Sequence, residues 1–248
     1  MIMKTALRQL IALHRTEQAD TRLGVVLAFV AGAINAGGFL AVGAYTSHMT
    51  GMVASITDLI VVNQWRTAVA IIPHVIAFFA GSVLSAVLIN WARLKKLASE
   101  FALPLMTEAL LLVVFGVLAA AGLGAGLGGL YALIALLCLI MGMQNGLITK
   151  ISHSEIRTTH MTGVITDLGI ETGRLLFGKA SHTDTRFSAV KLRRLLLLLA
   201  GFVIGGLAGA AAFNWIGFVA VLPLAVLLAV MALLPIADDL KRVFSPQR

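Results

Sequence analysis

Two short and nearly identical runs of polar residues are the part of this sequence that could do chemistry. Residues 47–51 read Ser-His-Met-Thr-Gly, and residues 159–163 read Thr-His-Met-Thr-Gly about 110 residues later. Their hydroxyl and imidazole groups can hydrogen-bond a polar solute, and His48 and His160 can also gain a proton near neutral pH. We call these runs the first core and the second core.

Each core is also typical of the start of a helix. Ser47 or Thr159 could cap free backbone N–H groups, with Thr50 or Thr162 three residues further on. A helix N-terminus presents unpaired donors and partial positive charge, which attract an anion. If both helices begin within a membrane, we expect the two cores to meet at one site, although caps that only end a loop would leave the same pattern.

A stripe of polar residues continues from each core. Asp58 follows the first core, and Asp167, Glu171 and Arg174 follow the second at spacings of three or four residues, which place them on one helix face. Charged groups facing lipid cost about 3 kcal/mol each, so this face must meet protein or water. Arg174 can pair with Glu171, which leaves Asp167 as the more available acid. Two interpretations remain open, a static ion-pair network and a proton-coupled polar pathway.

Amide side chains precede both cores and could line the same site. Asn35 comes before the first core, and Gln144 and Asn145 come before the second. The predicted substrate-binding residues are therefore Asn35, Ser47, His48, Thr50, Gln144, Asn145, Thr159, His160 and Thr162, and the predicted coupling residues are Asp58, Asp167, Glu171 and Arg174.

The elements that must hold these residues are membrane helices. Hydrophobic residues make up 59% of the chain and charged residues 12%, which is too few charges for a soluble protein of 248 residues. The apolar runs are close to the roughly 20 residues that a membrane-spanning helix needs, and they lack the alternation of a barrel strand. These runs are 23–42, 67–91, 103–121, 129–147, 195–213 and 216–234.

Further landmarks recur around both cores in the same order, which predicts a duplicated bundle. The landmarks are Ala-Gly-x-Val at 80–83 and 200–203, and Leu-Pro-Leu at 103–105 and 222–224. We expect five parts: a cytoplasmic amphipathic segment at 1–22, membrane repeats at 23–121 and 129–236, a glycine-rich connector at 122–128, and a cytoplasmic tail at 237–248.

Loop charges favour an inverted arrangement of the two repeats. If the two segments that begin at the cores do not cross the membrane, the basic residues between spans lie on the cytoplasmic side and only Arg66 lies outside. If both segments cross, Arg93, Lys95, Lys96 and others move outside. We therefore predict six full crossings and two broken or re-entrant segments, although both segments look long enough to cross. Both termini are then cytoplasmic.

Several function classes find little support in the sequence. There is no nucleophile triad, nucleotide fingerprint or close-spaced set of metal ligands, so we expect no enzyme, no cofactor and no metal. The net charge of +8 needs no nucleic-acid partner, because lipid headgroups account for basic loops. Cys138 and His74 are interpreted as packing residues, and Glu108 as a buried acid. Glycines spaced four apart could join helices within one chain or join subunits, so a homo-oligomer is possible.

The chain also resembles a known family. The order Asn-Ala-Gly-Gly-Phe at 35–39, Gly-Met-Gln-Asn-Gly at 142–146, and Arg-Thr-Thr-His-Met-Thr-Gly-Val-Ile-Thr-Asp-Leu at 157–168 is similar to the YoaK-like family of bacterial membrane proteins, over roughly residues 23–236. The family is a domain of unknown function, so the resemblance implies a bacterial inner-membrane protein but no substrate. Family members often have Thr-Gly-Asn in the first core, where this chain has Met52, so a role for that asparagine does not carry over.

Together these features predict a polytopic all-α membrane protein. The expected function is that of a secondary transporter or channel for a small polar or anionic solute, with a site between the repeats. The alternative is a scaffold or sensor in the bilayer that transports nothing and whose polar network is structural.

Overall fold

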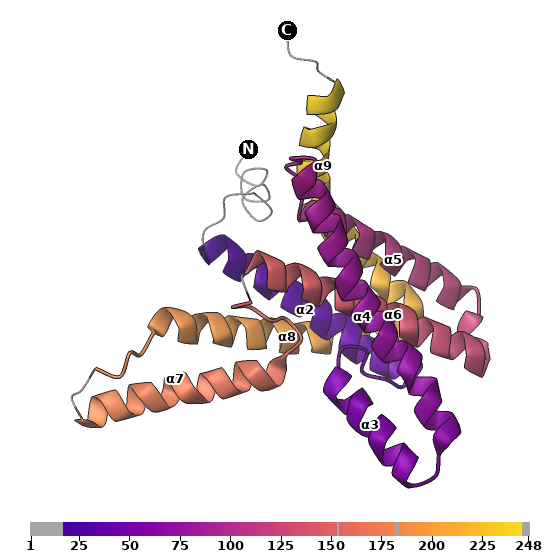
Figure 1. The fold of residues 1–248 in the computed structure, drawn as a ribbon, viewed down its shortest axis with the longest axis horizontal. Coiled ribbons are helices and arrows are strands. Elements are labelled where there is room, and N and C mark those ends of the chain that lie inside the picture. Colours follow the sequence, from indigo (N-terminus) through magenta and orange to yellow (C-terminus); the bar gives the residue numbers. More distant parts are fainter. Residues whose placement is uncertain (1–16, 153, 182–183, 245–248) are drawn as a thin grey trace.

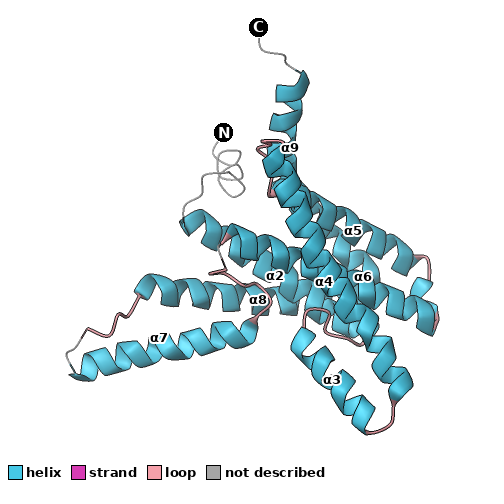
Figure 2. Ribbon diagram, viewed as in Figure 1, coloured by secondary structure: helices cyan, strands magenta, loops and turns pink. Residues whose placement is uncertain are grey.

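The computed structural model describes residues 17–152, 154–181 and 184–244, and every regular element in this part of the chain is helical (Figure 2). The longer helices are α2 (Glu17–Val42), α3 (Met49–Val61), α4 (Trp65–Leu94), α5 (Ala102–Ala120), α6 (Leu127–Ile151), α7 (Met161–Ser181), α8 (Ala189–Ile216) and α9 (Val221–Phe244). Two short 3-10 turns, η1 (Leu123–Ala125) and η2 (Gly217–Ala220), connect α5 to α6 and α8 to α9. Most of the predicted segment 1–22 and the end of the predicted tail lie outside the described residues.

Five stretches are long and apolar enough to cross a membrane, and they confirm a polytopic all-α membrane protein. Four of them coincide with α2, α4, α5 and α6, and the fifth, of 52 residues, contains both α8 and α9. The shortest, α5, has 19 residues and a length of about 28 Å, close to the hydrocarbon thickness of about 30 Å.

The two helices that follow the cores differ from these spans. Helix α3 has 13 residues, so it is about 20 Å long and too short to cross. The expectation that both segments are long enough to cross is therefore wrong for α3. Helix α7 has 21 residues, but its charged residues exclude it from the apolar spans.

Glycines bring two pairs of helices into close parallel contact. On α8, Gly201, Gly205 and Gly209 face Val25, Phe29 and Ala33 of α2 in the same chain direction. A Cβ atom on Gly205 would lie only 2.0 Å from the Phe29 carbonyl oxygen, so the approach requires glycine. Helices α4 and α6 pair in the same way, with Gly81 against Leu139 and Gly142 against Phe78.

Two other pairs run antiparallel, and they fix the direction of every span. Helix α5 meets α9 through Gly116 and Val221 at one end and through Ser99 and Asp239 at the other. Helices α2 and α6 are the second antiparallel pair. Gln144 of α6 lies against Leu27 of α2, and the earlier residue Leu137 of α6 lies against the later residue Gly38 of α2. The short turn η1 folds α6 back onto α5, so these two helices are also antiparallel. It follows that α2, α5 and α8 run one way, and that α4, α6 and α9 run the opposite way.

These directions decide what α3 and α7 do. Because α2 and α4 point in opposite directions, the chain makes no net crossing between them, and α3 does not span the membrane alone. The same holds for α7 between α6 and α8. In Figure 1, α3 lies beside the first half of α4 and α7 beside the first half of α8, so that two helical hairpins extend from the bundle.

Candidate functional site

Each core is tied to the helix before it by an asparagine. In the first core, the Ser47 hydroxyl and backbone N–H both donate to Asn35 Oδ1, at 3.0 and 3.2 Å. In the second core, the Thr159 hydroxyl donates to Asn145 Oδ1 at 2.7 Å. Each bond joins the first residue of a core to an asparagine twelve or fourteen residues earlier, so the asparagines position the start of both cores.

The histidines of the two cores also take matching positions. The His48 ring lies over Gly51, where its Cδ2 atom would be 2.1 Å from an added Cβ atom. The His160 ring lies over Gly163, with Nδ1 2.5 Å from the corresponding position. Both imidazoles are exposed, and Nδ1 of His160 lies 3.3 Å from Nη1 of Arg157. A side chain at either glycine would therefore require the histidine ring that precedes it to move.

One threonine beside each core has a buried hydroxyl. Thr46 and Thr158 are both fully buried, and neither hydroxyl oxygen has a hydrogen-bond partner among the described residues. Both threonines directly precede the residue that binds the asparagine. Comparison of the two copies could have found them, because threonine occupies this position in each.

Residues beside the two cores meet α2 at different levels. Thr46 lies near Gly38 of α2, whereas Ile156, three residues before Thr159, lies against Gly24 of the same helix. Fourteen helical residues separate these two glycines, which is about 21 Å along α2. The segments that lead into the cores are therefore offset along α2, and one site shared by both cores stays a prediction.

The second core borders two cavities. One cavity, of about 640 Å³, lies between α4 and α6 and is lined by Asn145, Lys150 and Ser154, among others. The other, of about 410 Å³, lies between the second core, α7 and α8. The polar and charged residues that line this smaller cavity are Ser154, Glu155, Arg157, His160, Thr162, Thr166 and Asp167. The structure thus brings together the predicted residues Asn145, His160, Thr162 and Asp167 around one turn of the chain.

Asp167 is one of two acids that line this smaller cavity, with Glu155. Its side chain is 45% exposed, and its Oδ2 atom lies 3.6 Å from Nζ of Lys191 on α8. Sequence reasoning missed Lys191, Arg157 and Lys150. Lys191 carries no signal in the sequence, because only the packing of α7 on α8 brings it to Asp167.

Glu171 has a different environment from Asp167. It is fully buried, and it accepts hydrogen bonds from Arg174 at 2.8 Å and from the backbone N–H of Ser188 at 3.1 Å. Lys191 lies 3.7 Å away. The Ser188 hydrogen bond, followed by the charges of Arg174 and Lys191, lowers the pKa of Glu171. The pairing expected from the sequence is present, and it joins α7 to the start of α8.

The remaining predicted residues take smaller roles. Gln144 is buried and donates to the Leu27 carbonyl, so it joins α6 to α2. Thr50 and Asp58 are exposed on α3, and Asp58 forms no ion pair with a described residue. His48 is the N-cap of α3 without a side-chain cap bond, so the capping role expected for Ser47 is wrong. In the described part of the chain, no three His, Cys, Asp or Glu side chains are placed to hold a metal ion.

Comparison with known proteins places the chain in a family. The family model described as "Protein of unknown function (DUF1275)" matches residues 23–234. The UPF0700 transmembrane protein YoaK of Bacillus subtilis (strain 168) is 26% identical over 185 residues, which cover 74% of this chain and 81% of the relative. No solved structure matches. Because the family model extends over both cores and most of the helical bundle, the chain belongs to the DUF1275 family.

Proposed function

We propose that this protein is a secondary transporter or channel for a small polar or anionic solute. The observation that carries the proposal is the matched pair of asparagine-bound cores at different depths of two antiparallel helices, α2 and α6. A polar cluster repeated toward each end of one helix pair suits a pathway that opens alternately to the two sides of a membrane. The proposed role involves no catalysis.

An inverted repeat is part of this proposal. The first copy would be α2 to α5 and the second α6 to α9, so that α2 corresponds to α6 and α5 corresponds to α9. Both α2 and α6, and α5 and α9, run antiparallel, which is the relation expected of copies inserted in opposite directions. Parallel copies would have corresponding helices that run the same way.

The proposed setting is the bacterial inner membrane with both termini in the cytoplasm. The loop before α5 contains Lys95 and Lys96, and the end of α6 contains Lys150. The span directions put these loops on one side, and the concentration of basic residues there favours the cytoplasm.

The cavities of the second core favour an anionic solute. Lys150 lines the larger one, and Arg157 and His160 line the smaller one. The two acids of the smaller cavity lie beside cations, Glu155 beside Arg194 and Asp167 beside Lys191. A carboxylate or phosphate group could accept hydrogen bonds from the Arg157 guanidinium and from the hydroxyl of Thr162. Asp167 and Lys191 would then adjust the charge of the cavity as the solute enters.

Flux in proteoliposomes tests this proposal. Purified protein would first be screened with small anions and polar metabolites for a rise in melting temperature, and the positive compounds would then be used as labelled solutes. Arg157→Gln and Asp167→Asn should each lower flux at least tenfold while the melting temperature changes little. Arg186→Gln, on an exposed loop residue, is the matched control. Wild-type flux in both cavity variants would refute the assignment of the pathway.

A scaffold or sensor role is the second candidate, and Glu171 favours it. Its carboxylate is fully used by Arg174, Ser188 and Lys191, an arrangement that holds two helices together. A purely structural network predicts that no tested solute moves, and that loss of one partner lowers stability. Flux and melting temperature measured on the same variants separate the two candidates.

A homo-oligomer is also proposed, through α7. The glycines of α6 and α8 contact helices of the same chain, but a side chain at Gly169 or Gly173 would meet nothing within 4 Å. These two glycines are therefore available for close contact with another copy. Gly173→Leu should lower the fraction of any oligomer seen by light scattering in detergent.

A further inference from the structure

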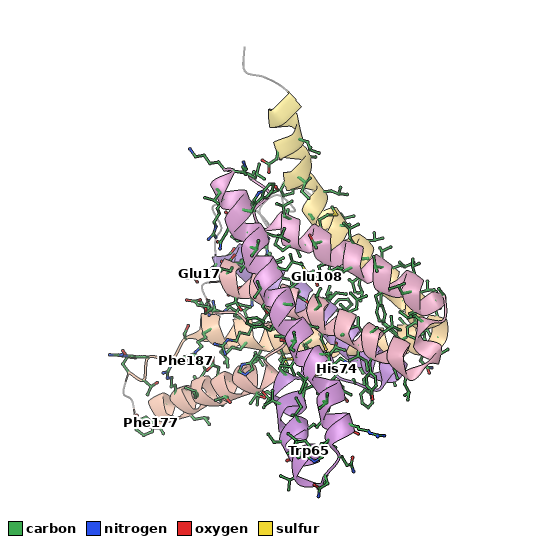
Figure 3. All side chains as sticks on the ribbon, turned by 45° about the vertical axis from the view of Figure 1, so that its right-hand side comes forward. Glu17, Trp65, His74, Glu108, Phe177 and Phe187 are labelled. Atoms are coloured by element: carbon green, nitrogen blue, oxygen red, sulfur yellow. The ribbon has the colours of Figure 1, made fainter. Side chains whose placement is uncertain are left out.

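Glu108 has a carboxyl group inside the bundle and is not part of the pathway proposed above. It lies on the buried face of α5, between Leu105 and Leu112, and its side chain is 1% exposed. Neither carboxyl oxygen has a hydrogen-bond partner among the described residues. Figure 3 shows Glu108 among the side chains of the helical bundle, far from Phe177 on α7.

On the α9 side, Glu108 faces apolar residues. Helices α5 and α9 run antiparallel between the Gly116–Val221 contact and the Ser99–Asp239 contact, which puts Glu108 level with residues 229–230. The buried side chains of α9 at that level are Leu228 and Met231.

With the exception of Cys138, the ionisable groups on the helices around α5 are bound elsewhere or lie at helix ends. Asp239 of α9 accepts from the backbone N–H groups of Ala98 and Ser99, and His74 Nε2 of α4 lies 3.2 Å from the carbonyl oxygen of Tyr131 on α6. Arg93 of α4 pairs with Glu100, just before α5 begins. Cys138 is a free thiol buried in the middle of α6. The other such groups lie near helix ends: Arg66 and Lys150, which are both exposed, Tyr131 near the start of α6, and Asp238, Lys241 and Arg242 in the last turns of α9.

The corresponding position in the proposed repeat holds no acid. Leu-Pro-Leu at 103–105 recurs at 222–224, so the position that corresponds to Glu108 in the second copy is Leu227, which is 36% exposed whereas Glu108 is 1% exposed. The buried acid is therefore particular to the first half. A carboxylate without a cation or a donor is strongly disfavoured in such a place.

We propose that Glu108 is a proton-binding site of the bundle, occupied by a proton when α5 and α9 are packed as in this structure. When the two helices separate and water reaches the carboxyl group, the proton can leave. Proton binding is thereby linked to the packing of α5 against α9. The proton site stands on its own geometry, but its use to drive solute movement depends on the proposed transport function.

Two measurements on the purified protein test the proton site without any solute. The first is the melting temperature of wild type, Glu108→Gln and Glu108→Leu in mildly acidic and mildly alkaline buffer. If folding requires a proton on Glu108, raising the pH should lower the melting temperature of wild type relative to both variants, by about 3 °C or more. Glu100→Gln is the control and should keep the wild-type difference, because Glu100 is paired with Arg93.

The second measurement is reaction with a membrane-permeant carbodiimide. The protonated carboxyl group adds across one C=N bond of the reagent, and acyl transfer to nitrogen gives an N-acylurea, so the peptide gains the whole mass of the reagent. Mass spectrometry should find this product at Glu108 in wild type and in Glu100→Gln. If Glu108→Gln and Glu108→Leu both fail to fold, labelling of wild type decides the question.

The two measurements also separate this proposal from the transport proposal. If the Glu108 variants fold, a melting temperature that depends on pH equally in wild type and in the variants would overturn the proton site. If neither variant folds, the absence of carbodiimide labelling at Glu108 in wild type would overturn it. A confirmed proton site in a protein without flux would leave the site standing and would refute only its coupling to transport.

Discussion

The Thr159 hydroxyl donates a hydrogen bond of 2.7 Å to Oδ1 of Asn145, which lies fourteen residues earlier near the end of α6. This bond closes the turn between α6 and α7, and it places His160 and Thr162 beside the smaller cavity. Ser47 and Asn35 make the corresponding bond in the first half. The position of each core is therefore set by one side-chain contact to the helix before it.

Asn145→Ala should destabilise the protein by about 1 kcal/mol, because the Thr159 hydroxyl loses its acceptor in a partly buried place. Amide hydrogen exchange in residues 154–163 should accelerate, since the contact that closes the turn is absent. Asn90→Ala, at an exposed position on α4, is the control and should change neither quantity. Unchanged exchange in Asn145→Ala would mean that the bond does not hold the second core.

The stability contributed by Glu171 should depend on pH. Because the pKa of Glu171 is lowered in the fold, this contribution is present above the ordinary carboxyl value of 4.5 and is lost as the pH falls through the lowered pKa. Glu171→Gln should melt at a lower temperature than wild type at neutral pH, and the difference should shrink in acid. Glu155→Gln, which removes an exposed partner of Arg194, is the matched control with a small effect at every pH.

The directions of the spans can be tested with cysteines in a Cys138→Ala background. Lys95→Cys, Ser154→Cys and Arg186→Cys should be shielded from a membrane-impermeant thiol reagent in whole cells and should react after the membrane is opened. Asn63→Cys, in the turn between α3 and α4, should react in intact cells. Labelling of position 95 from outside would contradict the inverted arrangement.

Gly205→Ala should destabilise the bundle by about 1–3 kcal/mol, because its new methyl group would overlap the carbonyl of Phe29. Gly128→Ala makes the same chemical change in the first turn of α6, where the added carbon meets nothing within 4 Å. That control should be neutral or more stable by up to about 1 kcal/mol, since alanine favours helix. Thermal unfolding in detergent compares the two directly.

Much of the fold follows from the sequence because lipid leaves a long apolar segment few choices. The apolar runs, the matching landmarks and the glycines of α8 predict spans and close contacts that the structure contains. The length of α3 was not predictable, because the polar turn at Asn63 and Gln64 is too short to stand out.

The candidate site was only partly predictable. Spacing along one helix predicts the Glu171–Arg174 pair, because both partners lie one turn apart. The distance between the two cores depends on the relative shift of α2 and α6 along their axes. Lys191 meets Asp167 only because α8 packs on α7. Contacts of that kind are decided by side-chain shape across a helix interface, on which composition and periodicity carry no information.

The antiparallel relation of α2 to α6 and of α5 to α9 has a consequence for direction. In the proposed inverted repeat, a half-turn about an axis in the plane of the membrane would exchange the helices of these pairs, so the scaffold would look much the same from either side. Such a scaffold cannot by itself distinguish inside from outside. Any preference for one direction must come from residues that break the match, such as Glu108 opposite Leu227 and Arg157 opposite Tyr45.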